Sequence, residues 1–236
     1  MEQYIQSAKI PDYIKSVKFD IGTSYGANQS QVWLSHDPDV FVFGFEPNPD
    51  CIDVIRAGNI QIQQPFHPPA IAQEYLDTRF CLVPVALDNV DQPKEMDFYK
   101  MRNDCGTSSL HNPIDSFIGP VKEVVKVPVY SLKQVFDVFP WDRFEYIEYI
   151  KIDAQGSDYD ILVSAGDYLK ERVVFITAEP EMYQYANCYH NSEHNMTHYL
   201  ASQNFERIHH PNTHDPTYIN KKFMHLKDQI YIYQQG

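Results

Sequence analysis

Short apolar segments recur along the chain and predict the strands of one sheet. They are rich in Val, Ile, Phe and Tyr, and several are almost continuously apolar rather than alternating. Such segments are typical of strands that are covered on both faces, as in a parallel sheet. The predicted strands cover residues 17–21, 40–45, 80–86, 146–152, 173–178 and 229–233.

Segments with helix-like patterning lie between these predicted strands. Because strands that alternate with helices indicate βαβ units, we expect an α/β fold with a doubly wound sheet. No repeat or shift in composition marks a boundary, so we expect a single domain over residues 1–236. The predicted helices cover residues 28–35, 49–57, 132–139, 159–170 and 193–203.

Two regions break the alternation of strands and helices. Residues 96–101 and 123–129 have strand character and flank the loop 103–120, which predicts a β excursion from the main sheet. The stretch 60–78 is rich in Pro and Gln and predicts a surface loop or a short helix.

Acidic residues outnumber basic ones. The chain has 19 Lys and Arg against 32 Asp and Glu, which gives a formal net charge of −13. Because a field of this sign repels a phosphate backbone, we expect no nucleic acid among the partners.

Cysteine spacing and hydropathy bear on where the protein acts. No two cysteines form a C-x-x-C pair, which is typical of a reduced, cytoplasmic protein. No stretch approaches 18 apolar residues, and the first residues lack the pattern of a signal peptide, so we expect no membrane span. The cysteines are Cys51, Cys81, Cys105 and Cys188.

A glycine-containing loop follows the first predicted strand and opens the first predicted helix. Gly22 and Gly26 permit a tight turn and close approach of a ligand to the backbone and to the helix N-terminus. Their G-x-x-x-G spacing differs from the pyrophosphate fingerprint G-x-G-x-x-G. Glu46 ends the second predicted strand, near the offset at which an acid meets ribose hydroxyls in Rossmann-like units. With Asp20 before the loop, these residues predict a nucleotide-type site; the alternative is a plain turn and a solvated strand end.

A longer series of motifs resembles the FkbM family of S-adenosylmethionine-dependent methyltransferases. The resemblance spans about residues 15–182, and the motifs occur in the family's order. They are Asp20-Ile-Gly-x-x-x-Gly26, Phe45-Glu-Pro-Asn-Pro49, Val85-Ala-Leu-Asp-Asn89, Gly106-Thr-Ser-Ser-Leu110, Ile150-Lys-Ile-Asp-Ala-Gln-Gly-Ser-Asp158, Ile161-Leu-Val-Ser-Ala-Gly166 and Glu179-Pro180.

The resemblance implies a fold. It implies the class I methyltransferase (Rossmann-like) fold, with a seven-stranded, mostly parallel sheet, one antiparallel strand near its edge, and helices on both faces. The segment 229–233 is our candidate for the antiparallel strand.

The resemblance also implies a binding site for S-adenosylmethionine. The loop from Asp20 to Gly26 would hold the amino-acid end of the cofactor, Glu46 the ribose, and the stretch from Ala86 to Asp88 would border the adenine. Asp153 would face the sulfonium and the methyl acceptor. The implied cofactor-binding residues are Asp20, Gly22, Ser24, Gly26, Asn28, Glu46, Ala86, Leu87, Asp88 and Asp153.

One motif departs from the family's pattern. Where the family often has Glu-Gly-x-Glu, this chain has Gln155-Gly-Ser-Asp158. A short polar residue there suits a helix N-terminus, and the departure leaves open whether these side chains touch the acceptor.

Asp153 is the first candidate for removing or orienting the proton of an acceptor hydroxyl. The alternative is a purely structural residue that ends a strand and caps the next helix. Asp153, Glu179 and Glu181 also form a candidate ligand set for Mg²⁺, which prefers carboxylate oxygens.

Histidines and tyrosines near the end of the matched region are further candidates. His190, His194 and His198 are spaced so that a helix would place them on one face. His194 and His198 are therefore alternative general bases, although a plain polar helix face explains the spacing equally simply. The Tyr-rich segment 182–189 is predicted either to wall an acceptor pocket or to pack onto the sheet.

The sequence thus predicts an S-adenosylmethionine-dependent O-methyltransferase that acts on a sugar hydroxyl of a glycan or glycoconjugate. The alternatives are an O-methyltransferase of a small natural product and a cofactor-binding module without catalysis. A nicotinamide dehydrogenase is disfavoured, because the loop lacks the third glycine of that fingerprint and carries Asp20 before it.

Overall fold

A computed structural model describes residues 1–58, 70–115, 117–210 and 213–234 of the chain. Its main sheet has seven strands in the order β3-β2-β1-β7-β8-β10-β9. Strand β10 runs antiparallel to both of its neighbours, and the other pairs are parallel. The strands are β1 (Ser16–Ile21), β2 (Val40–Phe45), β3 (Phe80–Val83), β7 (Ile147–Ile152), β8 (Val173–Ala178), β9 (Phe205–Ile208) and β10 (Thr217–Asn220).

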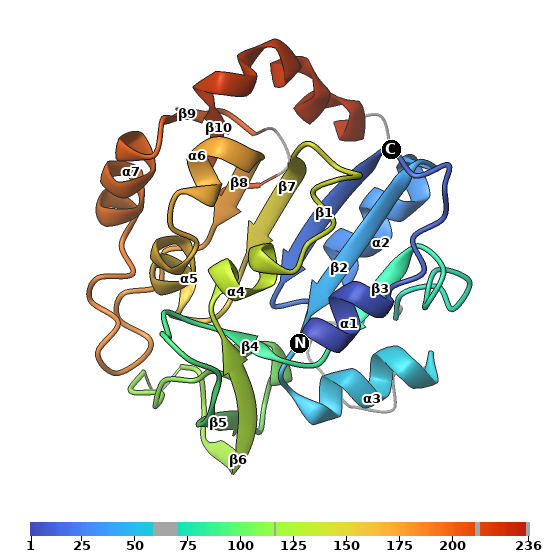
Figure 1. The fold of residues 1–236 in the computed structure, drawn as a ribbon. Coiled ribbons are helices and arrows are strands. Elements are labelled where there is room, and N and C mark those ends of the chain that lie inside the picture. The colour runs from blue at the N-terminus through green and yellow to red at the C-terminus, as the bar shows by residue number, and fades with distance from the viewer. Residues whose placement is uncertain (59–69, 116, 211–212, 235–236) are drawn as a thin grey trace.

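Helices cover both faces of this sheet, which confirms the predicted fold class (Figure 1). One apolar cluster packs the side chains of Phe19 and Ile150 against α1 (Glu2–Ser7), α4 (Leu132–Asp137), α5 (Asp158–Ser164) and α7 (Glu193–Ser202). The cluster on the other face packs Val42 against α2 (Asn28–His36), α3 (Pro49–Ala57) and the 3-10 helix η2 (Lys221–Gln234). Burial on both faces explains why these strands read as continuous apolar segments.

The predicted antiparallel strand at 229–233 is wrong. Those residues belong to η2, and the antiparallel strand is β10, whose four residues are all buried. Asn220 ends β10, and its amide Nδ2 donates to the backbone oxygens of Lys170 and Val173 at 2.9 and 3.0 Å. Because Thr217 and Asn220 are polar residues with internal partners, β10 produces no apolar segment in the sequence.

Two further elements are divided where the sequence predicted one. The segment 80–86 splits at Pro84, which lacks an N–H for a sheet hydrogen bond, into β3 and β4 (Ala86–Leu87). The segment 159–170 splits into α5 and α6 (Tyr168–Arg172), separated by Gly166 with its left-handed φ of +59°. Most of the predicted loop or helix at 60–78 lies outside the described residues.

The predicted β excursion forms a second, three-stranded sheet in the order β4-β6-β5. It consists of β4, β5 (Lys94–Met101) and β6 (Val121–Tyr130), with a small core that includes Phe98, Leu110 and Val129. Figure 1 shows this sheet beyond the carboxyl ends of the parallel strands. The loop between β5 and β6 carries the short 3-10 helix η1 (Cys105–Thr107) back toward the main sheet. The two sheets therefore meet where ligands of open α/β sheets bind.

Candidate functional site

A cavity of about 350 Å³ lies between the carboxyl ends of the main strands and the second sheet. The loop after β1, the end of β2, and the residues after β7 and β8 form one side of it, and η1 forms another. Of the predicted cofactor-binding residues, those that line it are Gly22, Ser24, Gly26, Asn28, Glu46, Ala86, Leu87 and Asp153. The other two, Asp20 and Asp88, do not line the cavity.

Gly22 allows the β1 loop to lie directly against the end of β7. Its φ is +79°, and a Cβ atom there would stand 1.8 Å from the backbone oxygen of Asp153. Its N–H donates to the Phe45 oxygen at 3.0 Å. The absence of a side chain at this position thus brings the ends of β1, β2 and β7 together.

Glu46 is held in the cavity wall by the backbone. Its Oε2 accepts a hydrogen bond from the Ser24 N–H at 2.7 Å, and its Oε1 accepts one from the Asn48 N–H at 2.8 Å. Burial raises the pKa of Glu46 to about 7, although both hydrogen bonds favour the ionised form. Each carboxylate oxygen can still accept a second hydrogen bond, so this side chain can bind two neighbouring hydroxyls.

Asp20 lies behind the glycine loop rather than in the cavity. Its Oδ2 accepts from the N–H and the hydroxyl of Ser30, at 3.1 and 2.6 Å, in the first turn of α2. Its Oδ1 is 3.9 Å from the ammonium nitrogen of Lys151. Asp20 therefore anchors the start of α2 and supports the loop.

Asp153 follows β7, and both of its carboxylate oxygens have partners. Lys151 Nζ lies 3.0 Å from Oδ2, and the Gln155 amide Nε2 donates to Oδ1 at 2.7 Å. Desolvation alone would raise the pKa of Asp153, but the Lys151 charge and the hydrogen bonds outweigh it and lower that pKa. Asp153 is consequently an ionised, firmly oriented carboxylate at the edge of the cavity.

Three more carboxyl groups gather beside Asp153. Asp158 accepts hydrogen bonds from the N–H groups of Ala154 and Glu179, at 3.2 and 3.0 Å. Burial and the neighbouring negative charges raise the pKa of Asp158 to about 7, that of Glu181 to about 8 and that of Glu179 to about 9. Burial and the close spacing of like charges therefore favour the protonated forms of these three carboxyl groups.

The predicted magnesium site finds no support in this arrangement. Within the described ranges, no three His, Cys, Asp or Glu side chains are placed to hold a metal ion. The Lys151 ammonium already occupies the position of a cation beside Asp153. The residues do not fit a metal, and we derive no step through one.

The predicted histidine bases lie away from the cavity. His194 and His198 are exposed on α7, and neither lines it. His190 precedes α7, and its Nε2 is 2.6 Å from Asp160 Oδ2. His111, which was not predicted as a site residue, contacts a residue of the cavity. Its Nε2 is 3.0 Å from the hydroxyl oxygen of Ser157, a cavity residue.

Tyr185, in the Tyr-rich segment after β8, is buried over one end of the site. Its hydroxyl oxygen lies 2.7 Å from Gln155 Oε1 and 2.8 Å from the Thr107 backbone oxygen. Tyr183 and Tyr189 of the same segment are exposed. Tyr185 thus fixes Gln155, which in turn fixes Asp153.

Lys151 and His111 contact the cavity residues Asp153 and Ser157, and neither was among the site residues predicted from the sequence. A lysine two residues before Asp153, inside a buried strand, is an available signal, since buried charges are normally paired. His111 lies in an irregular loop, where periodicity carries no information about its neighbours.

A protein-family model described as the methyltransferase FkbM domain matches residues 20–207. The matched range includes the glycine loop, Glu46, Asp153 and the carboxyl cluster. No curated protein matches the chain. Within the described residues, no helix is long and apolar enough to cross a membrane.

Proposed function

The chain belongs to the FkbM methyltransferase family, and from this we propose that it is an S-adenosylmethionine-dependent O-methyltransferase acting on a sugar hydroxyl. The observation that carries the proposal is the position of Glu46. This carboxylate stands in the wall of a cavity at the carboxyl ends of parallel strands, with each oxygen held by a backbone N–H.

The residues that line the cavity fit S-adenosylmethionine. Glu46 suits the two ribose hydroxyls, Ala86 and Leu87 offer an apolar border for the adenine, and the loop from Gly22 to Gly26 exposes backbone to the amino-acid end. When bound, S-adenosylmethionine supplies a methyl group on a positively charged sulfur. The ionised carboxylate of Asp153, at the edge of the cavity, favours a ligand with positive charge.

Asp153 orients the acceptor in this proposal. Its carboxylate is held by Lys151 on one oxygen and by Gln155 on the other. It accepts a hydrogen bond from the acceptor hydroxyl and aligns that oxygen with the methyl group, because alignment is the main requirement of an in-line displacement. Its lowered pKa makes it a weaker base than a neutral histidine, so we assign it orientation first and proton uptake second.

A sugar hydroxyl is the acceptor that we propose, on the basis of the family resemblance and the polar side chains at this end of the cavity. Gln155, Ser157 and Glu179 all line it. The net charge of −13 favours a small molecule or glycan over nucleic acid. We also propose a cytoplasmic location, on the cysteine spacing alone.

Calorimetry with S-adenosylhomocysteine tests the cofactor site. We expect the protein to bind S-adenosylhomocysteine and not NAD. We expect Glu46→Gln to weaken this binding at least about tenfold, because a hydrogen bond to a charged group contributes about 1.5–3 kcal/mol. Glu171→Gln, an exposed change on α6, is the matched control and should bind as the parent protein does.

An unchanged affinity in Glu46→Gln, with normal folding by circular dichroism, would reject the proposed role of Glu46. Turnover of labelled S-adenosylmethionine with a panel of glycans and small hydroxylated molecules separates the acceptor classes. Binding without turnover on any acceptor would favour the cofactor-binding module instead.

A further inference from the structure

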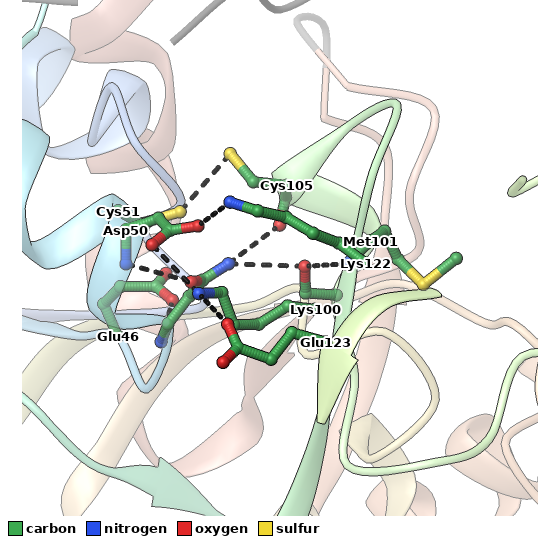
Figure 2. Close-up of polar contacts among 10 residues, drawn as sticks. Glu46, Asp50, Cys51, Lys100, Met101, Cys105, Lys122 and Glu123 are labelled. Atoms are coloured by element: carbon green, nitrogen blue, oxygen red, sulfur yellow. Dashed lines mark hydrogen bonds and ion pairs between the residues drawn. The ribbon is translucent and has the colours of Figure 1, made fainter. Parts of the chain in front are cut away.

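Cys51 and Cys105 place two thiols side by side next to the cavity. They are 54 positions apart in the chain, yet Cys51 Sγ donates to Cys105 Sγ at 3.5 Å. Cys51 lies in the first turn of α3, directly after the Glu46 segment, and Cys105 begins η1. Both are buried, and Figure 2 shows the sulfurs facing each other between the two elements.

Polar contacts around the thiols hold the second sheet against the start of α3. Lys100 of β5 and Lys122 of β6 place their ammonium nitrogens 2.9 and 2.8 Å from the two carboxylate oxygens of Asp50 (Figure 2). The Asn48 amide Nδ2 donates to the Ser108 hydroxyl at 3.3 Å and to the Cys105 backbone oxygen at 3.5 Å. The proximity of the two sulfurs therefore follows from a network that ties both elements together.

The two thiols differ in access. Cys105 lines the cavity, whereas Cys51 does not and packs behind it with Val54 and Tyr25. A small hydroperoxide that enters the cavity meets the Cys105 sulfur first and finds the Cys51 thiol in contact with it. The hydrogen bond to Cys105 and, to a smaller extent, burial raise the pKa of the Cys51 thiol. Both effects favour the protonated thiol.

We propose that Cys51 and Cys105 are a modification site, a dithiol that hydroperoxides oxidise to a disulfide that fixes η1 to α3. In the first step the Cys105 sulfur attacks a peroxide oxygen, the O–O bond breaks, and the thiol proton passes to the leaving oxygen. The products are a sulfenic acid on Cys105 and water, or an alcohol when the oxidant is an organic hydroperoxide. In the second step the Cys51 sulfur attacks the Cys105 sulfur, the S–O bond breaks, and water leaves with the Cys51 proton. Two thiols and one hydrogen peroxide thus give one disulfide and two waters.

The disulfide requires only a small movement. A disulfide has an S–S distance near 2.05 Å, so the sulfurs must approach by about 1.5 Å. The new bond would join residues 104–108, which line the cavity, to the helix that follows Glu46. It therefore restrains one wall of the cavity relative to the other.

The other two cysteines provide controls. The Cys81 thiol lies near the Tyr4 backbone oxygen, and the Cys188 thiol near the Ala186 backbone oxygen. Among the described residues, the hydrogen-bond partner of each of these thiols is a backbone oxygen and not a second sulfur. A Cys188→Ser variant should therefore behave as the parent chain does.

Mass spectrometry of the peroxide-treated full-length protein is the first test. After treatment with hydrogen peroxide, alkylation and digestion without reductant, we expect a cross-linked pair of peptides that contains Cys51 and Cys105. Dithiothreitol should release it, Cys51→Ser and Cys105→Ser should each abolish it, and Cys188→Ser should retain it. Absence of the cross-link in the folded parent protein, or sulfinic acid on Cys105 as the sole product, overturns the proposal.

Hydrogen exchange tests whether the bond restrains the wall. In the oxidised protein we expect the amides of residues 104–110 to exchange at least about threefold more slowly than in the reduced protein, because local opening becomes less favourable. Peroxide-treated Cys51→Ser should exchange as the reduced parent does. A cross-link without slower exchange would show that the disulfide does not fix η1.

A consequence for ligand exchange rests on the proposed function. If the cavity binds S-adenosylhomocysteine, the oxidised protein should release it more slowly than the reduced protein, and Cys51→Ser should show no such difference after peroxide. Failure of the reduced protein to bind S-adenosylhomocysteine contradicts the proposed function, while the cross-link and exchange results still decide the dithiol.

Discussion

Carboxyl groups outnumber ammonium groups beside the cavity. The pKa of each carboxyl group therefore depends on whether its main charged neighbour is a cation or another carboxylate. Lys151 is the cation that the structure brings to Asp20 and Asp153, and it keeps Asp153 ionised. Glu179 faces the Asp153 charge, and its pKa is raised by burial and by that charge to about 9. A positively charged ligand would therefore displace protons as it binds.

The raised pKa of Glu179 predicts how stability depends on pH. A carboxyl that holds its proton more tightly when folded stabilises the native state at low pH, and this contribution is lost as pH rises through the folded pKa. We expect the Tm of the ligand-free protein to fall between about pH 5 and pH 9. Glu179→Gln removes the titrating group, so its Tm should fall less steeply over this range.

Scanning calorimetry at several pH values measures this difference, with Glu171→Gln as the exposed control on α6. If Tm falls with pH at the same rate in Glu179→Gln and in the parent protein, folding does not raise the pKa of Glu179, and this prediction is wrong.

The family motifs supplied ten candidate cofactor-binding residues, and eight of them line the cavity. Their contact with a cofactor stays a prediction. Asp20 and Asp88 do not line the cavity, because each carboxylate accepts hydrogen bonds from the protein's own groups, the Ser30 hydroxyl and the Asn89 N–H. Position in a motif cannot distinguish a carboxylate that faces a ligand from one that supports the loop around it.

At the scale of elements, apolar continuity located the strands that are covered on both faces. It missed β9 and β10, because β9 alternates in burial and β10 contains Thr217 and Asn220, whose polar groups have internal partners. The same criterion mistook the end of η2 for a strand. A short apolar segment is compatible with either a strand or a helix, so apolar content alone cannot distinguish the two.

The side chain of Asn220 links β10 to α6, and replacing it measures how much this link stabilises the protein. Its amide donates to backbone oxygens at the end of α6 and the start of β8. Asn220→Leu keeps the branched shape of the side chain but leaves these oxygens without their donor, so we expect the free energy of unfolding to fall by about 2–4 kcal/mol. Urea unfolding measures it, with the exposed Asn89→Leu as control; a loss no larger than that control's would contradict this role.

At the scale of the whole molecule, the second sheet completes the site. The parallel strands deliver Gly22, Glu46 and Asp153 to one edge, and the loop between β5 and β6 closes the cavity with η1. Figure 1 shows why no single segment of the sequence could reveal this: β4 and β6 are far apart in the chain but pair next to the main sheet. The site is a product of topology as much as of motifs.

A crystal structure of the protein with S-adenosylhomocysteine tests the central claim most directly. We expect both ribose hydroxyls within hydrogen-bond distance of the Glu46 carboxylate, the adenine beside Ala86 and Leu87, and the sulfur directed toward Asp153. A ligand bound outside this cavity, or a Glu46 carboxylate that makes no contact with the ribose, would contradict it.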